Sequence, residues 1–465
     1  MVYTVDERLT FRFRENYAVN LGSFFLLEPW IYPDMFDKGG ANEFDGMTNQ
    51  VASIGLDAAV QKLRSHYNEY FNAIDWNWLK NSANITALRV PIGYWHVNNG
   101  AYLDGLPFAP LKPLYAAATP WIFLRNLIAK AYTYKIGIIV DMHGLPGGAN
   151  ADFHSGYNNA TATFFTNESY VNIMCNQILP FIVSDVCTPN VNTVGIQIVN
   201  EASYESSGTT QKNYYLKAIQ AINKIDSTLP VIISDGWNPQ VFAEWVNNYN
   251  LGWTTVIDTH IYRCYSDSDK SKSAGTIINE LPSTANLPKT LADFVIGEFS
   301  CVLDEATWQK TSGDRTTWIK NFGQTQVSVF NSNAGAGWFF WTLKFKYGDG
   351  GEWGFVPCVN KGFIPERSKT TVNIDSNAVN NLIKQHQDYW NKIGGSYEFW
   401  RYSDALNGVV DDIKKFSSYN NSRIGRWAAW KKIRRSEYIA SKGDSQYMWE
   451  WDQGFQAGLD NFNKY

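Results

Sequence analysis

Residues 194–201 read Val-Gly-Ile-Gln-Ile-Val-Asn-Glu, a short apolar run that ends in an amide and a carboxylate. A run of this kind, rich in β-branched side chains, is typical of a strand buried in a parallel sheet. Residues 294–298, Phe-Val-Ile-Gly-Glu, repeat the pattern and again end in a carboxylate. Because burying an uncompensated carboxylate costs several kcal/mol, the two strand ends favour a functional role for both Glu201 and Glu298.

Six further runs of this kind alternate with longer segments of helical period, the pattern of parallel strands joined by crossover helices. The Gly-x-Gly-x-x-Gly turn of an open dinucleotide-binding sheet is absent. The sequence therefore predicts the α/β class and a closed (β/α)8 TIM barrel. The expected strands are residues 17–24, 87–93, 136–143, 194–201, 230–235, 255–262, 294–299 and 337–343.

In such a barrel the carboxyl ends of all eight strands meet on one face, where the active sites of this fold lie. The expected strand ends carry carboxylates, imidazoles, an arginine and aromatic rings. Each of these has a structural alternative when taken alone, as a cap, an ion-pair partner, a core histidine or a packing indole. Together they form a candidate site: Glu28, Arg89, His143, Asn200, Glu201, His260, Tyr262, Glu298 and Trp341.

The charge balance of the 465-residue chain bears on its partners. Its 40 Lys and Arg against 44 Asp and Glu give a net charge of −4, which offers no electrostatic footprint for nucleic acid or an anionic membrane. The most apolar long segment, residues 121–140, is interrupted by Arg125, Lys130 and Lys135, so no membrane span is expected. The oligomeric state stays open.

The residue pattern favours one kind of chemistry over its alternatives. The six histidines never fall in a His-x-His or His-Glu-x-x-His spacing, so no metal or other cofactor is expected. No Gly-x-Ser-x-Gly elbow for a serine nucleophile occurs. Two carboxylates in a cup lined by aromatic rings are what cleavage of a glycoside needs, one as a proton donor and one at the anomeric carbon.

The strand ends resemble those of glycoside hydrolase family 5, in particular its fungal exo-β-1,3-glucanase branch. The motifs occur in family order over roughly residues 15–365. They are Asn20-Leu21-Gly22, Leu27-Glu28-Pro29-Trp30-Ile31, Leu88-Arg89-Val90-Pro91-Ile92-Gly93-Tyr94-Trp95, Asp141-Met142-His143-Gly144-Leu145-Pro146-Gly147, Ile198-Val199-Asn200-Glu201, His260-Ile261-Tyr262, Ile296-Gly297-Glu298-Phe299-Ser300 and Gly337-Trp338-Phe339-Phe340-Trp341-Thr342-Leu343-Lys344.

This resemblance implies a retaining hydrolase of terminal β-D-glucosyl residues, with Glu201 as acid/base and Glu298 as nucleophile. On physical grounds we expect Arg89 and Tyr262 to keep Glu298 ionised, and a lower-dielectric surrounding to raise the pKa of Glu201 so that it holds a proton near neutral pH. The sugar in the −1 subsite would contact Glu28, Arg89, His143, Asn200, His260, Tyr262 and Trp341. The substrate would be a β-glucoside or β-glucan.

Three places depart from the branch pattern. Ala202 follows the acid/base where proline is usual, Trp30 stands where the family often has tyrosine, and residues 150–156 read Asn-Ala-Asp-Phe-His-Ser-Gly in place of Asn-Gly-Phe-Asp-Asn-Ser-Gly. These changes bear on the entrance for the leaving group. One alternative is therefore an intracellular β-glucosidase for hydrophobic glucosides with steryl, lipid or flavonoid aglycones. A non-catalytic carbohydrate-binding relative is the other.

The domain organisation is expected to be a catalytic barrel over residues 1–395 and a helical extension over residues 396–465. Residues 376–392 would supply the last barrel helix. The extension carries tryptophans among charges at helical spacing, and no Pro/Gly/Ser-rich linker precedes it, so we expect it to pack on the barrel. The acidic start of the chain does not fit a signal peptide, which suggests a cytoplasmic protein unless a leader has been removed.

Overall fold

The structure is a computed structural model that describes residues 5–157, 161–251 and 253–464. Its internal contacts separate two compact units. One is residues 16–366, and the other combines the described part of residues 1–15 with residues 367–464. Each unit is described by itself below.

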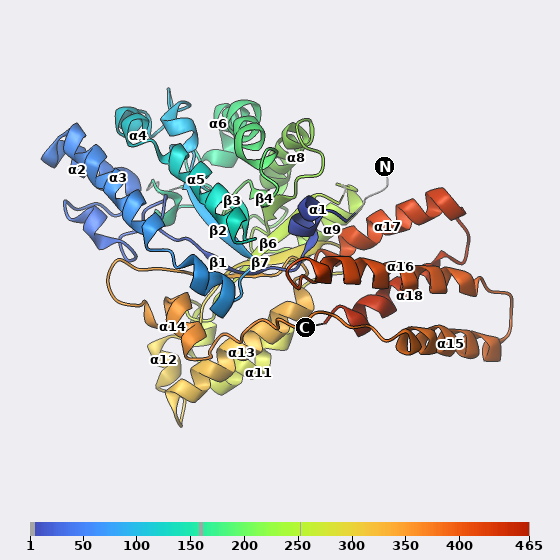
Figure 1. The fold of residues 1–465 in the computed structure, drawn as a ribbon. Helices are drawn as coiled ribbons and strands as arrows, with labels where there is room; N and C mark the ends of the chain where they lie inside the picture. The colour runs from blue at the N-terminus through green and yellow to red at the C-terminus, as the bar shows by residue number, and fades with distance from the viewer. Residues whose placement is uncertain (1–4, 158–160, 252, 465) are drawn as a thin grey trace. The chain divides into compact units, whose positions relative to one another are not determined.

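The first unit is built on a closed barrel of eight parallel strands in sequence order (Figure 1). β1 pairs with both β2 and β8, which closes the sheet. The predicted barrel is confirmed, and every expected run overlaps one strand. The strands are β1 (Tyr17–Asn20), β2 (Ala87–Gly93), β3 (Gly137–Gly144), β4 (Thr193–Gln197), β5 (Val231–Ser234), β6 (Thr255–Ile261), β7 (Asp293–Phe299) and β8 (Trp338–Phe340).

Helices surround these strands. The α-helices of this unit are α2 (Glu43–Ile54), α3 (Leu56–Asn72), α4 (Lys112–Ala118), α5 (Pro120–Thr133), α6 (Glu168–Ile173), α7 (Leu179–Ile182), α8 (Thr209–Asn223), α9 (Pro239–Asn248), α10 (Asp267–Lys270), α11 (Ala274–Thr284), α12 (Glu305–Trp308), α13 (Arg315–Asn333) and α14 (Phe355–Asn360). The short helices are η1 (Pro33–Phe36), η2 (Trp78–Ser82), η3 (Val97–Gly100), η4 (Ala109–Leu111), η5 (Phe153–Ser155), η6 (Phe164–Thr166), η7 (Met174–Ile178), η8 (Val183–Cys187) and η9 (Gly351–Trp353).

The barrel core changes from apolar to polar along the strands. One buried cluster contains an inward side chain from each strand, and the small Ala18 and Ala87 leave room for the large Phe339. Side chains of a strand alternate between its two faces, so the residue two positions further on points the same way. That step leads from Ala87 to Arg89 and from Val256 to Asp258. The apolar layer therefore supports a buried polar layer beneath the site.

The second unit joins the start of the chain to its end. α1 (Glu7–Phe13) belongs with α15 (Ser376–Ile393), α16 (Phe399–Ser418), α17 (Trp427–Lys442) and α18 (Met448–Phe462). Its core includes Val379 of α15 packed with Tyr402, Leu406 and Val410 of α16. The division thus falls after residue 366 and not after 395, and α15 is not the last barrel helix. The reason is that the apolar side of α15 is covered by α16.

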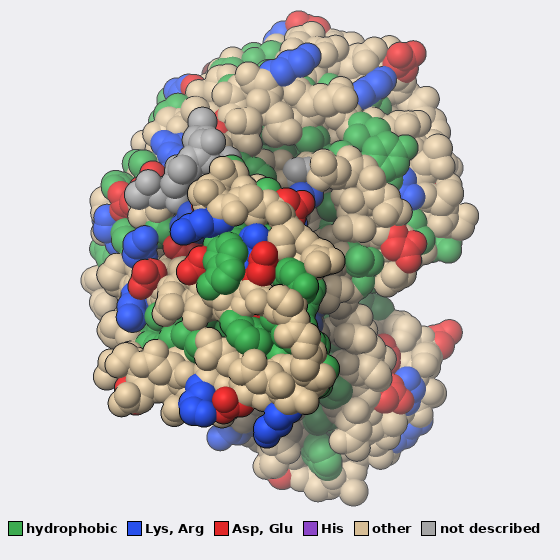
Figure 2. Space-filling model, turned by 90° about the vertical axis from the view of Figure 1, so that its right-hand side faces the viewer, with side chains coloured by type: hydrophobic (Ala, Val, Ile, Leu, Met, Phe, Trp, Pro, Cys, Tyr) green, Lys and Arg blue, Asp and Glu red, His purple; other side chains and the backbone are tan. Residues whose placement is uncertain are grey.

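The surface charges and the apolar segments can be compared with the expectations from the sequence. On the face in Figure 2, basic and acidic side chains are interspersed, with no broad patch of one sign. One segment, Glu168–Cys187, is long and apolar enough to cross a membrane, although half of it is buried inside the protein, as in the core helix of a barrel. Among the described residues, this segment and not residues 121–140 meets the length and hydropathy criteria. All five cysteines are buried, and none forms a disulfide.

Candidate active site

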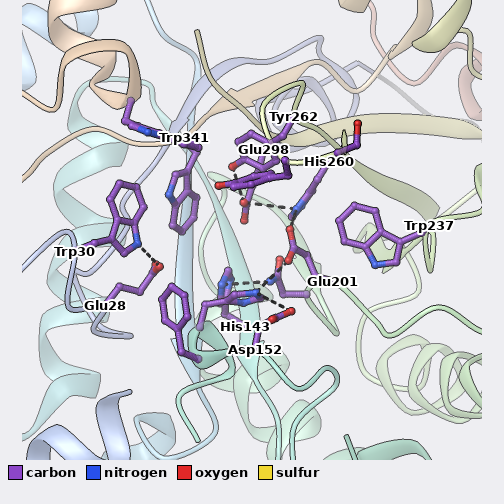
Figure 3. Close-up of a pocket in the computed structure, with 16 residues that line it drawn as sticks. Glu28, Trp30, His143, Asp152, Glu201, Trp237, His260, Tyr262, Glu298 and Trp341 are labelled. Atoms are coloured by element: carbon purple, nitrogen blue, oxygen red, sulfur yellow. Dashed lines mark hydrogen bonds and ion pairs between the residues drawn. The ribbon is translucent and has the colours of Figure 1, made fainter. Parts of the chain in front are cut away.

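A pocket of about 490 Å³ opens at the carboxyl ends of the strands (Figure 3). Eight of the nine predicted site residues line it, and the ninth, Arg89, lies buried below with 1% of its surface exposed. The lining also contains residues that were not predicted. The complete lining is Glu28, Trp30, His143, Asp152, Phe153, His154, Asn200, Glu201, Trp237, His260, Tyr262, Tyr265, Ser266, Glu298, Trp341 and Trp353.

Glu298, on β7, receives two hydrogen bonds. Arg89 Nη1 donates to its Oε1 at 2.9 Å, and the Tyr262 hydroxyl donates to its Oε2 at 2.9 Å. Both donors favour the carboxylate form, and Arg89 supplies a full positive charge. Because each oxygen has its own donor, the carboxylate is held in one orientation. Its side chain stays 7% exposed, on the pocket side.

Arg89 is the centre of the buried polar layer. Its Nη2 donates to Asn200 Oδ1 at 2.7 Å and lies 3.0 Å from Asp141 Oδ2. Its Nε donates to Gln197 Oε1 at 2.8 Å, and its Nη1 donates to Asn20 Oδ1 at 2.9 Å. These contacts fix the guanidinium plane, and through it the position of Glu298.

Asn200 and His143 form the wall next to this layer. Since Asn200 Oδ1 accepts from Arg89, its Nδ2 faces His143 Nε2 at 3.2 Å. His143 Nδ1 lies 2.8 Å from Asp141 Oδ2 and donates to it, so Nε2 is the acceptor and the ring is neutral. The ring runs nearly parallel to the Trp341 indole, with centroids 5.9 Å apart.

Glu201 lies beyond the end of its strand. β4 ends at Gln197, and Glu201 has a φ of 40°, in the left-handed region that non-glycine residues rarely occupy. The Asn150 side chain donates to its carbonyl oxygen at 2.9 Å, and the Ser234 hydroxyl accepts from the next amide at 3.1 Å. The expected strand to residue 201 is therefore too long by four residues, because side chains and not a neighbouring strand take these backbone groups.

Two imidazoles flank the carboxylate of Glu201. His260 Nδ1 lies 2.6 Å from Oε1, and His154 Nε2 lies 3.2 Å from Oε2. His260 Nε2 in turn lies 2.9 Å from Asp258 Oδ2. Both nitrogens of His260 therefore face oxygens that can only accept, and both must carry a proton. Burial tends to lower the pKa of His260, but the charges of Glu298 and Asp258 outweigh it and raise the pKa well above the ordinary value.

The expected rise in the pKa of Glu201 is wrong for the ligand-free pocket. Burial does act to raise this pKa, but the hydrogen bonds and positive charges of His154 and His260 hold it well below the ordinary value. Among Glu201 and its two neighbouring imidazoles, the protons are therefore favoured on the imidazoles.

The two predicted catalytic carboxylates lie close together. An oxygen of Glu201, a nitrogen of His260 and an oxygen of Glu298 are all within 4.8 Å of one another. Within the part of the chain that the structure describes, this is also the group with the right spacing to chelate a cation. Arg89 and His260 already supply positive charge to these carboxylates, so the cluster is balanced by the protein itself.

The pocket rim is aromatic. Trp30 Nε1 donates to Glu28 Oε2 at 2.8 Å, and the ring centroids of Trp30 and Trp353 are 5.5 Å apart. Trp237 stands on the opposite side, beyond Glu201, and is 50% exposed (Figure 3). The sequence contained signals for some of these residues, since Trp237 follows the end of β5. Asp258 could have been inferred from its place two residues before His260, but Trp353 and His154 lie in short three-residue helices that leave no periodic pattern in the sequence.

Comparisons of the chain with family models and with curated proteins agree on one protein family. Residues 44–347 match the cellulase family (glycosyl hydrolase family 5), and residues 373–465 match the C-terminal domain of glucan 1,3-beta-glucosidase 3. An uncharacterized glycosyl hydrolase of Saccharomyces cerevisiae is 48% identical over 99% of this chain and 93% of its own length. Glucan 1,3-beta-glucosidase 3 of Schizosaccharomyces pombe is 29% identical over 96% of this chain and 94% of its own length.

A solved structure agrees in fold. The crystal structure of rutinosidase from Aspergillus niger superposes with a TM-score of 0.59, covering 78% of this chain and 99% of that chain at 19% identity. The barrel, the two carboxylates and the family match together define a glycoside hydrolase. The chain belongs to glycosyl hydrolase family 5, with relatives among the fungal glucan 1,3-beta-glucosidases.

Proposed function

We propose that the protein is a retaining, exo-acting β-glucosidase that removes terminal β-D-glucosyl residues by double displacement. The observation that carries this proposal is the approach of Glu201 and Glu298 to within 4.8 Å. Carboxyl groups about 5–5.5 Å apart are typical of retaining glycosidases, whereas inverting enzymes keep them about 6.5–9.5 Å apart for an intervening water.

In the first step the Glu298 carboxylate attacks the anomeric carbon. A new ester bond forms as the bond to the leaving oxygen breaks, and Glu201 transfers a proton to that oxygen. Arg89 and Tyr262, which already donate to Glu298, orient the attacking oxygen. The imidazole pair beside Glu201 supplies the proton that it gives away.

In the second step a water molecule displaces Glu298 from the anomeric carbon of the sugar. Glu201, now ionised, takes a proton from the water, the water oxygen bonds to the anomeric carbon, and Glu298 leaves as a carboxylate. The hydrogen bonds and charges of His154 and His260 favour the ionised form of Glu201, which is the form that can accept this proton. Two inversions at the same carbon leave the configuration unchanged.

The leaving group would lie between the exposed aromatic side chains of the rim. Phe153, Trp237 and Tyr265 are 41%, 50% and 63% exposed. Flat apolar surfaces of this kind bind a sugar face or a hydrophobic ring. The relatives' names support a β-1,3-glucan substrate, while the aromatic rim supports the second candidate, a glucosidase for hydrophobic aglycones.

Activity of the whole protein on a panel of β-glucosides tests the proposal. We expect hydrolysis of p-nitrophenyl β-glucoside and of at least one of laminaribiose or a steryl glucoside. Glu298→Ala should lose essentially all turnover, because the only attacking group is gone. A Glu298→Ala protein that keeps its activity, and that is free of wild-type enzyme, would refute the assignment. A wild-type protein that binds glucosides without cleaving them would favour the non-catalytic alternative.

A further inference from the structure

His154 is one of the two imidazoles beside Glu201, and it was not among the predicted site residues. It lies in η5, within the segment where the chain departs from its branch of the family. Its Nε2 is 3.2 Å from Glu201 Oε2 and 3.8 Å from Asp152 Oδ2. Its Nδ1 is shielded from solvent and has no hydrogen-bond partner among the described residues. The polar contacts of the ring therefore converge on Nε2, where two carboxylates meet.

The surroundings of His154 are mostly acidic. Asp152 and Glu201 are its nearest charged neighbours, and the charge of Glu28 also acts on it. The neutral His143 ring lies edge-on with its centroid 5.5 Å away. Burial tends to lower the pKa of His154, but the interactions with the carboxylates of Asp152 and Glu201 outweigh it and raise the pKa well above the ordinary value. The carboxylates that face Nε2 thus favour the charged imidazolium form of the ring.

We propose that Asp152 and His154 form a positioning pair that holds the free oxygen of Glu201 and keeps a positive charge beside it, so setting the pH range in which Glu201 acts. Glu201 is then clamped between two cations, with His260 on Oε1 and His154 on Oε2. Only the second of these comes from the divergent segment. This inference rests on the proposed function, because it assigns His154 a task in the work of Glu201.

The direction of the effect follows from the charge. A cation beside a carboxylate favours its ionised form, so His154 lowers the pKa of Glu201. Glu201 works as a base when ionised and as an acid when protonated. Removing the charge of His154 should therefore move two limits to higher pH. These are the acidic limit of the base-dependent second step and the alkaline limit of the acid-dependent first step.

His154→Gln is the main variant, because glutamine keeps a side-chain N–H donor and removes the charge. With 2,4-dinitrophenyl β-glucoside, kcat reports the second step. With an alkyl β-glucoside, kcat/KM reports the first. We expect both limits to rise by about one pH unit or more in His154→Gln. Asp57→Asn, which removes an exposed carboxylate outside the pocket lining, is the control and should shift neither.

Nitrogen-15 NMR of the imidazoles in wild-type protein gives an independent readout if the variants fold poorly. We expect both nitrogens of His154 to be protonated at pH 7. Unchanged pH limits in a folded His154→Gln enzyme, or a neutral His154 ring at pH 7, would overturn the inference. A wild-type protein inactive on every glucoside would instead overturn the proposed function, and the ring's protonation state would still test the charge.

Discussion

At the scale of single residues, the site divides into two halves with different electrostatics. Glu298 is fixed by Arg89 and Tyr262, which donate to it directly. Glu201 is held by His154 and His260, which can both give and take protons. The carboxylate of Glu298 is thus held by two fixed donors, while the carboxylate of Glu201 lies next to two imidazoles. This difference matches the two roles of the proposed mechanism.

Glu201→Ala should separate these roles. We expect its first step to stay near the wild-type rate with a 2,4-dinitrophenyl leaving group, which needs no protonation. With an alkyl β-glucoside we expect a loss of about 10²–10⁴-fold, the usual contribution of general acid catalysis. Pre-steady-state release of dinitrophenol against steady-state cleavage of the alkyl glucoside measures both. Equal losses with both leaving groups would assign Glu201 a purely structural role.

At the scale of elements, the strands could be predicted because each apolar run ends in polar or aromatic side chains at the same edge of the sheet. The residue at which β4 ends could not be predicted. The backbone of Glu201, with a φ of 40°, depends on hydrogen bonds from side chains in distant segments, those of Asn150 and Ser234. The role of His154 escaped prediction for the same reason. It reaches Glu201 from the three-residue helix η5, which is too short to give a periodic signal.

Gly297 gives a prediction about how β6 and β7 position the site. A Cβ atom at this position would overlap the carboxylate of Asp258, which holds His260. We therefore expect Gly297→Ala to lower kcat and to destabilise the fold by about 1–3 kcal/mol, as overpacking does. Urea unfolding and glucosidase assays measure the two effects.

Gly408→Ala is the matched control for this substitution. Gly408 lies in α16, where an added Cβ meets nothing within 4 Å. We expect it to stabilise the protein by up to about 1 kcal/mol, through helix propensity alone, and to leave kcat unchanged. If Gly297→Ala behaves in the same way, the close contact with Asp258 does not position His260.

At the scale of the whole molecule, the chain folds as two compact units, and its first residues belong with its last. Sequence reasoning placed the division at residue 395, because residues 376–392 have the helical period of a barrel helix. It could not detect that α1 joins the second unit, since this association links residues hundreds of positions apart in the chain. Patterns along the sequence report local structure and not which helices share a core.

Removal of residues 396–465 should therefore destabilise the protein strongly. The deletion takes away α16, α17 and α18, and leaves Val379 of α15 without Tyr402 and Leu406. We expect insoluble protein, or a melting temperature well below that of the full chain, measured by calorimetry. A soluble truncated enzyme with an unchanged melting temperature and altered preference among aglycones would show instead that these helices serve recognition.

The account depends most on the mechanism assigned to Glu201 and Glu298, and the configuration of the first product tests it directly. Proton NMR of the anomeric signals in the first minutes of β-glucoside hydrolysis distinguishes the two outcomes before mutarotation mixes them. Two displacements at one carbon predict that β-glucose is released first. Initial release of α-glucose would contradict the account, because it requires a single displacement by water between carboxylates that the structure places within 4.8 Å.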